Sequence, residues 1–173
     1  MDALNEITLL QEISMTTVIR LIILLALTFG AALLGAAFTT SDTLSTWYAG
    51  LHKPPFNPPS WVFGPVWTIL YCLMAVSALL IWQKGLDNHL VRLALVLFLL
   101  QLALNALWTP LFFGLKMPTL ALLDILVLWL AIALTILAFA KISAPAALLL
   151  VPYILWVTFA VVLNAAICLL NRG

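Results

Sequence analysis

Five long apolar stretches, separated by short polar or proline-containing segments, run through this chain of 173 residues. They cover residues 18–40, 65–83, 90–113, 118–140 and 145–170. Each is long enough for an α-helix to cross the hydrocarbon core of a bilayer, which takes roughly 20 residues. The pattern predicts an all-α integral membrane protein, a bundle of five transmembrane helices that forms a single domain over residues 1–173.

The composition points to the same class of protein. Hydrophobic residues make up 66% of the chain and charged residues 8%, and the mean hydropathy is +1.24. A soluble globular domain has roughly 25% charged residues, so this chain cannot cover a surface that faces water. The net charge of +1 gives no indication of a nucleic-acid partner. The acidic residues before the first stretch fit neither a secretory signal nor a mitochondrial presequence, and we expect a short amphipathic or disordered lead-in there.

The segment between the first and second stretches, WYAGLHKPPFNPPSWVFGPVW, is unlike the rest of the chain. It holds five of the nine prolines. Proline lacks a backbone N–H and disfavours helical conformation in the residue before it, so we expect a stiff, extended or turn-like loop. One interpretation is an interfacial linker. The other, which we favour, is a lid over a cavity mouth with Trp47 and Phe56 in contact with the ligand, because a preorganised backbone loses less entropy on binding.

Aromatic and polar side chains recur at helical spacing in three of the predicted helices, where residues three or four positions apart share a face. The three faces are Trp67, Tyr71, Met74, Ala78 and Trp82; Gln101, Asn105, Trp108 and Phe112; and Tyr153, Trp156, Ala160 and Asn164. Amides can bond helices together and tryptophans can form interfacial belts, and Trp82 suits a belt. For Trp108 and Trp156, which share their faces with amides, we favour an inward-facing cavity wall.

Asp124 is the one acidic residue deep in an apolar stretch. Ionisable residues inside a membrane are costly and normally face the bundle interior or a wet cavity. Two roles carry equal weight, a structural residue that holds one helix to another and a residue of the ligand site. The two histidines lie in predicted loops and the two cysteines in apolar stretches, with no metal-ligand spacing. We therefore expect no metal site, no catalytic residues and no required cofactor.

The first stretch carries small residues at helical spacing. Ala31 and Gly35, with Ala32 and Ala36, form pairs that allow two helices to approach closely. We weigh two explanations, an interface between two copies of the chain and close packing within one copy, and slightly favour the first.

The proline-rich segment and the start of the second stretch fit the pattern W-Y-x-x-L-x-K-P-x-F/W-x-P-P-x-x-x-F-x-P-V-W-T-x-L-Y. With QLALNALWTPLFFG from Gln101 and PYILWVTFAVVLN from Pro152, the chain resembles the translocator protein family, also called tryptophan-rich sensory proteins or peripheral benzodiazepine receptors. The resemblance covers nearly everything after about Arg20.

This resemblance implies a five-helix bundle, often dimeric, with an internal pocket closed by the first loop. Family members bind porphyrins such as protoporphyrin IX, cholesterol, and synthetic isoquinoline carboxamides or benzodiazepines. With the two loop aromatics, the candidate ligand-binding residues are Trp47, Phe56, Trp67, Tyr71, Asn105, Trp108, Asp124, Trp156, Ala160 and Asn164. Leu120 stands where the family often has a tryptophan. Ala165 stands where animal members have the tyrosine of a cholesterol pattern, which favours a bacterial inner membrane over the mitochondrial outer membrane.

Three functions follow from these features, in descending order of preference. The first is a membrane receptor or sensor for porphyrins, with sterols or isoquinoline-type drugs as further ligands. The second is a transporter of tetrapyrroles or other hydrophobic ligands. The third is light-dependent porphyrin degradation, with Trp67 and Trp156 as the redox-active groups. The expected partners are the lipid bilayer, a porphyrin or sterol, and a second copy of the chain in a homodimer, and no nucleic acid.

Overall fold

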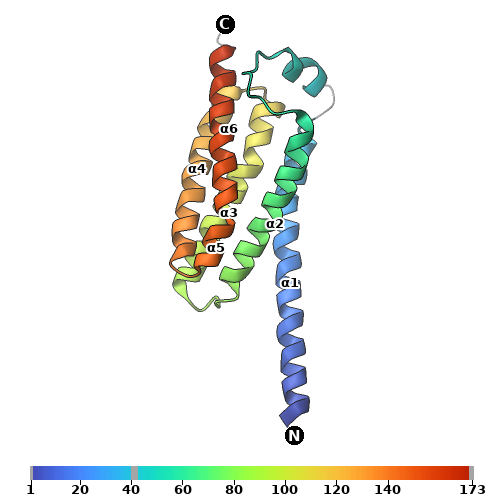
Figure 1. Ribbon diagram of the computed structural model, residues 1–173, viewed down its shortest axis with the longest axis vertical. Helices are drawn as coiled ribbons and strands as arrows, with labels where there is room; N and C mark the ends of the chain where they lie inside the picture. Colours follow the sequence, from blue (N-terminus) through green and yellow to red (C-terminus); the bar gives the residue numbers. More distant parts are fainter. Residues whose placement is uncertain (1, 40–42, 172–173) are drawn as a thin grey trace.

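The computed structural model describes residues 2–39 and 43–171, and helices dominate it (Figure 1). The helices are α1 (Asp2–Ala37), α2 (Phe63–Trp82), α3 (His89–Thr109), α4 (Pro118–Ala140), α5 (Ala144–Leu149) and α6 (Val151–Leu170). Five segments of the described chain are long and apolar enough to cross a membrane: Met15–Ala37, Ser60–Trp82, His89–Gly114, Pro118–Ala140 and Ala144–Leu170. The predicted fold class, an all-α protein with five transmembrane helices, is confirmed. Residue 40, the predicted end of the first helix, lies outside the described residues.

Helix α1 is much longer than a membrane span requires. Its 36 residues correspond to roughly 54 Å at 1.5 Å per residue, against ~30 Å of hydrocarbon. Figure 1 shows its N-terminal part, in dark blue, extending well beyond the other helices. The expected lead-in is therefore part of one continuous helix, and its disordered alternative was wrong.

Prolines interrupt two of the predicted spans. Pro110 follows α3 and opens a short π-helical turn, η3 (Pro110–Gly114). Pro152 is the second residue of α6, and a break at Leu150 separates α6 from α5. Proline cannot donate a hydrogen bond to the carbonyl four residues earlier, and its ring crowds that carbonyl. The last predicted helix is consequently two helices in series.

The bundle has two ends that differ in their connections (Figure 1). At one end lies the segment between α1 and α2, which includes a π-helical turn, η1 (Thr43–Tyr48), and a 3-10 turn, η2 (Ser60–Val62), beside the C-terminus of α6. We call this end the loop half, and it contains residues 31–39, 43–71, 105–128 and 156–170. We call the other end the base half, and it contains residues 74–102 and 131–150.

Small side chains bring the helices together in the base half. Ala75, Ala78, Ala94 and Ala146 are completely buried, and small residues allow close helix contact in a membrane. The Ser77 hydroxyl donates a hydrogen bond of 2.7 Å to the Ala146 carbonyl and so joins α2 to α5. This end is a closed core, which leaves the loop half as the place for a site.

Candidate ligand cavity

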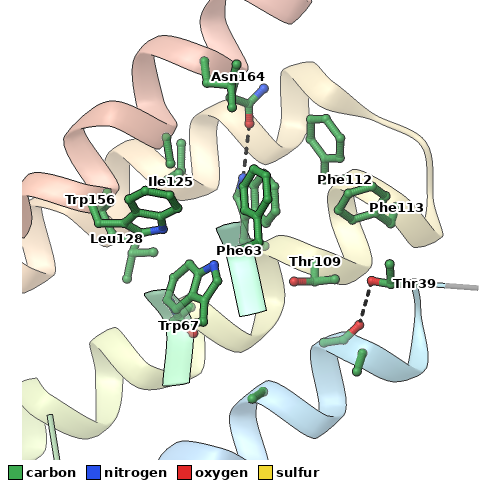
Figure 2. Close-up of a pocket in the computed structure, with 18 of the residues that line it drawn as sticks. Thr39, Phe63, Trp67, Thr109, Phe112, Phe113, Ile125, Leu128, Trp156 and Asn164 are labelled. Atoms are coloured by element: carbon green, nitrogen blue, oxygen red, sulfur yellow. Dashed lines mark hydrogen bonds between the residues drawn. The ribbon is translucent and has the colours of Figure 1, made fainter. Parts of the chain in front are cut away.

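The loop half encloses a cavity of about 560 Å³ (Figure 2). Residues from α1, α2, α3, η3, α4 and α6 line it, together with Thr39, Tyr48 and Ser60 of the connecting segment. Ligand sites for small organic molecules have volumes of roughly 300–1,000 Å³. The cavity is therefore large enough for a ligand with several fused or linked rings.

Three tryptophans form much of the cavity wall, each from a different helix. Trp67 of α2 stacks on Tyr71 with ring centroids 5.3 Å apart and an interplanar angle of 28°. Trp108 of α3 stacks on Phe112, with corresponding values of 4.9 Å and 21°. Trp156 of α6 meets Phe63 edge to face, at 5.9 Å and 74°. Such pairs hold the rings in place, so the wall is rigid.

Hydrogen-bonded side chains form the floor of the cavity. The Tyr71 hydroxyl donates to Asn105 Oδ1 at 2.9 Å, and Asn105 Nδ2 donates to the Tyr153 hydroxyl at 3.1 Å. Tyr153 in turn donates to Gln101 Oε1 at 2.9 Å. Tyr71 and Asn105 line the cavity, whereas Tyr153 and Gln101 lie below them and are completely buried. This floor network ties α2, α3 and α6 together between the two halves.

Asn164 fixes the Trp108 ring. Its Oδ1 accepts a hydrogen bond of 3.1 Å from Trp108 Nε1, shown as a dashed line in Figure 2, and its Nδ2 donates to the Pro118 carbonyl at 2.9 Å. The amide therefore bonds three helical segments together while it also lines the cavity. The two explanations considered for the amides, helix–helix bonding and cavity wall, hold for Asn164 at once.

Two indole groups point into the cavity with unused hydrogen-bonding capacity (Figure 2). No described residue accepts a hydrogen bond from the N–H of Trp67 or Trp156. The lining contains no Asp, Glu, Lys, Arg or His among the described residues. Groups of three or more potential metal ligands are also absent from the part of the chain that the structure describes. The chemistry of the cavity lining suits a flat, mostly apolar molecule that carries hydrogen-bond acceptors.

Contacts within the connecting loop, and one with η3, hold the loop in place. Tyr48 packs edge to face on Phe113 at 5.5 Å, and its hydroxyl donates to Asn57 Oδ1 at 3.3 Å. The Lys53 ammonium lies 4.4 Å above the Tyr48 ring, a cation–π contact. Burial raises the pKa of the Tyr48 phenol above its ordinary value, so the hydroxyl stays neutral and keeps its proton to donate.

Asn171, just after α6, anchors the same loop through its side chain. Its Oδ1 accepts a hydrogen bond of 3.0 Å from the His52 backbone N–H, and its Nδ2 donates to the His52 carbonyl at 2.9 Å. These two bonds join positions far apart in the sequence. No motif in the sequence marked Asn171 as an anchor of this loop, because its role depends on where the loop returns to the bundle.

The structure places seven of the ten candidate ligand-binding residues in the cavity lining. They are Trp67, Tyr71, Asn105, Trp108, Trp156, Ala160 and Asn164. The other three lie outside it. Trp47 packs edge to face on Phe112 at 5.6 Å, and Phe56 is 48% exposed and packs on Phe159. Ligand contact stays a prediction for all ten.

Asp124 is buried next to the cavity but does not line it. Its Oδ2 has no hydrogen-bond partner among the described residues. The carboxyl group therefore forms no side-chain bond through that oxygen to a neighbouring helix. Neither of the two roles considered for Asp124 gains direct support from this position.

The small residues of α1 face the inside of the bundle. Ala31, Ala32, Gly35 and Ala36 all line the cavity. A Cβ atom added to Gly35 would lie 3.0 Å from Thr109 Oγ1, so α1 and α3 approach closely there. Packing within one copy, the less favoured of the two explanations, accounts for these residues. The sequence did not mark them as cavity lining, because small side chains carry no chemical signal of a site.

The fold and cavity together define a class: integral membrane proteins in which five helices enclose an aromatic, uncharged internal site. Residues 22–170 match the TspO/MBR family, and the chain belongs to that family. It is 43% identical over 154 residues to a tryptophan-rich protein TspO of Chlorobaculum tepidum, which covers 89% of this chain and 97% of that protein.

Further relatives come from other bacteria and from animals. A tryptophan-rich sensory protein of Cereibacter sphaeroides is 44% identical over 149 residues, covering 85% of this chain and 91% of that one. A translocator protein of Bos taurus is 42% identical over 133 residues, covering 76% and 78%.

Proposed function

We propose that this protein is a membrane receptor or sensor that binds porphyrins, with protoporphyrin IX as the representative ligand, in the cavity of the loop half. Membership of a family that includes a tryptophan-rich sensory protein supports the receptor or sensor role. The observation that carries the ligand class is the lining itself, three tryptophans around about 560 Å³ with no charged side chain among the described residues. A porphyrin is flat and largely apolar, and it offers acceptor atoms to the free indole N–H groups.

The porphyrin carboxylates need a different environment from the ring. A carboxylate buried without a partner is costly, and no cationic side chain of the described residues lines the cavity. We propose that the carboxylates lie toward the loop, where Lys53 sits over the cavity-lining Tyr48. Sterols and isoquinoline-type molecules are further candidates, because they too are apolar and carry few polar groups.

Titration of the purified protein with protoporphyrin IX tests this function. We expect saturable binding that quenches tryptophan fluorescence, and weaker binding in Trp156→Leu, which removes a cavity wall. Leu155→Ala, a change to the neighbouring residue, which is 63% exposed, is the matched control. A parent protein with no saturable binding would exclude the porphyrin site.

The same titration separates binding from degradation. The indoles of Trp67 and Trp156 border the cavity without hydrogen-bond partners among the described residues, and they are the groups that light-dependent chemistry would use. Porphyrin absorbance is followed in light and in darkness. A receptor leaves the absorbance constant in both, whereas loss only in light favours degradation.

We further propose a bacterial inner membrane as the location, since Ala165 replaces the tyrosine of the animal cholesterol pattern. The protein is an integral membrane protein, as its five candidate spans and its family membership indicate. A homodimer stays a proposal, with an interface other than the inward-facing small residues of α1. Fractionation of the source cells and chemical cross-linking in membranes test these two points.

A further inference from the structure

The exposed residues of the cavity lining gather where α1 ends and α2 begins. Among the lining residues, all of them described, only Ala36, Ser60 and Gly64 are exposed. Ala36 lies in the last turn of α1, Ser60 in η2, and Gly64 in the first turn of α2. These three residues therefore mark an opening between the end of α1 and the start of α2.

The opening lies where the two helices are apolar enough to be inside the membrane. Ala36 belongs to the span Met15–Ala37, and Ser60 and Gly64 belong to the span Ser60–Trp82. Near it on the outer surface stand large exposed side chains, with Leu33 72% and Trp61 74% exposed. Trp61 suits the boundary between acyl chains and headgroups, where tryptophan is enriched. The opening thus faces lipid close to that boundary.

Small side chains leave this opening unobstructed. A Cβ atom added to Gly64 would meet nothing within 4 Å. Gly35 on the same side of the cavity differs, because a Cβ atom there would press on Thr109 at 3.0 Å. Helix α1 therefore approaches α3 closely at Gly35, whereas Gly64 leaves room for a side chain at the edge of the opening.

Contacts within the protein hold the loop in place. Two hydrogen bonds join Asn171 to His52, and the Lys53 ammonium lies over the Tyr48 ring in the neighbouring part of the same loop, so a route past the loop has to displace a segment held by these contacts. Each hydrogen bond adds roughly 0.5–1.5 kcal/mol of net stability. An apolar ligand is also concentrated in the bilayer rather than in water.

We propose that the ligand enters and leaves the cavity sideways from the bilayer, through the opening framed by Ala36, Ser60 and Gly64. This inference rests on the proposed function, since it needs a ligand that binds in the cavity. The loop then acts as a fixed cover, and the gap between α1 and α2 selects for membrane-dissolved, flat molecules.

Stopped-flow fluorescence with protoporphyrin IX, on protein in lipid nanodiscs, tests the route. Gly64→Phe places a ring in the opening, and Ala36→Phe does so from the opposite side. We expect both the association and the dissociation rate constants to fall about tenfold, a barrier raised by about 1.4 kcal/mol. The dissociation constant, their ratio, stays within about twofold, a change of roughly 0.4 kcal/mol.

Two further variants serve as a control and as a test of the alternative route past the loop. Gly30→Phe changes another α1 glycine with open space around it, away from the cavity lining, and should leave both rates unchanged. Asn171→Ala loosens the loop and should also leave them unchanged. Faster exchange in Asn171→Ala, with parental rates in both phenylalanine variants, would overturn the sideways route in favour of the loop.

Equilibrium titration keeps this test separate from that of the proposed function. Absence of saturable binding in the parent overturns the function and the route together. Saturable binding with parental rates in well-folded Gly64→Phe and Ala36→Phe overturns the route alone. A weaker equilibrium affinity at an unchanged association rate would show that the new ring occupies the cavity itself, and it would also count against the route.

Discussion

The base half and the loop half of the bundle share α2, α3 and α4 but fill the space between their helices differently. In the base half, Met74, Phe98 and Phe139 are completely buried, and Phe98 stacks on Phe139 at 6.2 Å. In the loop half, Trp67 and Trp156 are only partly buried and border a cavity of about 560 Å³. The difference shows how one bundle can combine a closed core with a binding site.

The size and stiffness of the side chains explain the contrast. Alanines in the base half let the helices approach, and flexible Met or Leu side chains fill the remaining gaps. In the loop half, rings that stack on one another are too rigid to collapse into the space. The floor network of Tyr71, Asn105, Tyr153 and Gln101 lies between the two halves and holds the helices at a fixed spacing. Mutations of the closed core should therefore act on stability, and mutations of the aromatic cavity wall on ligand affinity.

The largest effect is expected from Phe98→Ala in the base half. Removing a buried phenylalanine leaves a cavity, and such changes cost about 3 kcal/mol or more of unfolding free energy. Porphyrin affinity per folded molecule should stay within about twofold, or roughly 0.4 kcal/mol. Denaturant titration in detergent and fluorescence titration measure the two quantities. Leu99→Ala, at a neighbouring position that is 48% exposed, is the control and should change neither. A comparable loss of affinity in Phe98→Ala would mean that the halves are coupled.

Replacing four prolines with alanine tests whether the stiffness of the loop contributes to protein stability or to ligand affinity. The four are Pro54, Pro55, Pro58 and Pro59. Each compatible proline stabilises by about 0.4–1 kcal/mol through lower entropy of the unfolded chain, so four imply roughly 2–4 kcal/mol. Because the loop is anchored by contacts within the protein, such as Asn171 with His52, we expect the cost as lost thermal stability. Affinity should be nearly retained. The opposite pattern would mean that the loop orders only around its ligand, and no change in either quantity would reduce it to a linker.

Tyr153→Phe probes the floor network. Its hydroxyl accepts from Asn105 and donates to Gln101, so the variant leaves two buried polar groups without that partner, at a cost of about 2 kcal/mol of stability. Tyr71→Phe removes only one bond, to Asn105 Oδ1, and should cost about half as much. Melting temperatures of the two variants test this order. Equal melting temperatures of the two variants would show that the Tyr153 hydroxyl does not contribute more hydrogen bonds than the Tyr71 hydroxyl.

The sequence predicts the spans and the three tryptophans and two amides of the cavity wall for a physical reason. Hydropathy identifies the five helices, and helical periodicity places Trp108, Asn105 and Phe112 on one face. Periodicity does not say what that face meets, because lipid-facing and buried surfaces are both apolar in a membrane. For this reason the inward direction of Gly35 was not favoured, and the position of Asp124 outside the lining could not be derived. Asn171 was missed because its contact with His52 joins two segments that are far apart in the sequence.

Trp67→Phe should separate affinity from stability within the loop half. A smaller ring keeps part of the stacking on Tyr71 but loses wall area and an indole N–H. We expect about three- to tenfold weaker porphyrin binding, equivalent to roughly 0.7–1.4 kcal/mol, with an unchanged melting temperature. Trp61→Phe makes the same chemical change at a position that is 74% exposed and outside the lining, and it should leave affinity at the parental value. Equal losses of affinity in both variants would point to a general effect of tryptophan removal. They would contradict the assignment of Trp67 to the ligand site.

The smallest effect is expected from Asp124, which lies beside the loop-half cavity without lining it. Asp124→Asn keeps the size of the side chain and removes its ability to ionise, so porphyrin affinity should stay within about twofold, or roughly 0.4 kcal/mol. Asp124→Leu removes a buried oxygen that has no hydrogen-bond partner among the described residues. Replacing such a group by an apolar one is close to neutral or stabilising, so the melting temperature should not fall. A lower melting temperature in Asp124→Leu, with affinity intact, would assign Asp124 to helix–helix packing. A large loss of affinity in Asp124→Asn at an unchanged melting temperature would instead make Asp124 part of the ligand site and extend that site behind the visible lining.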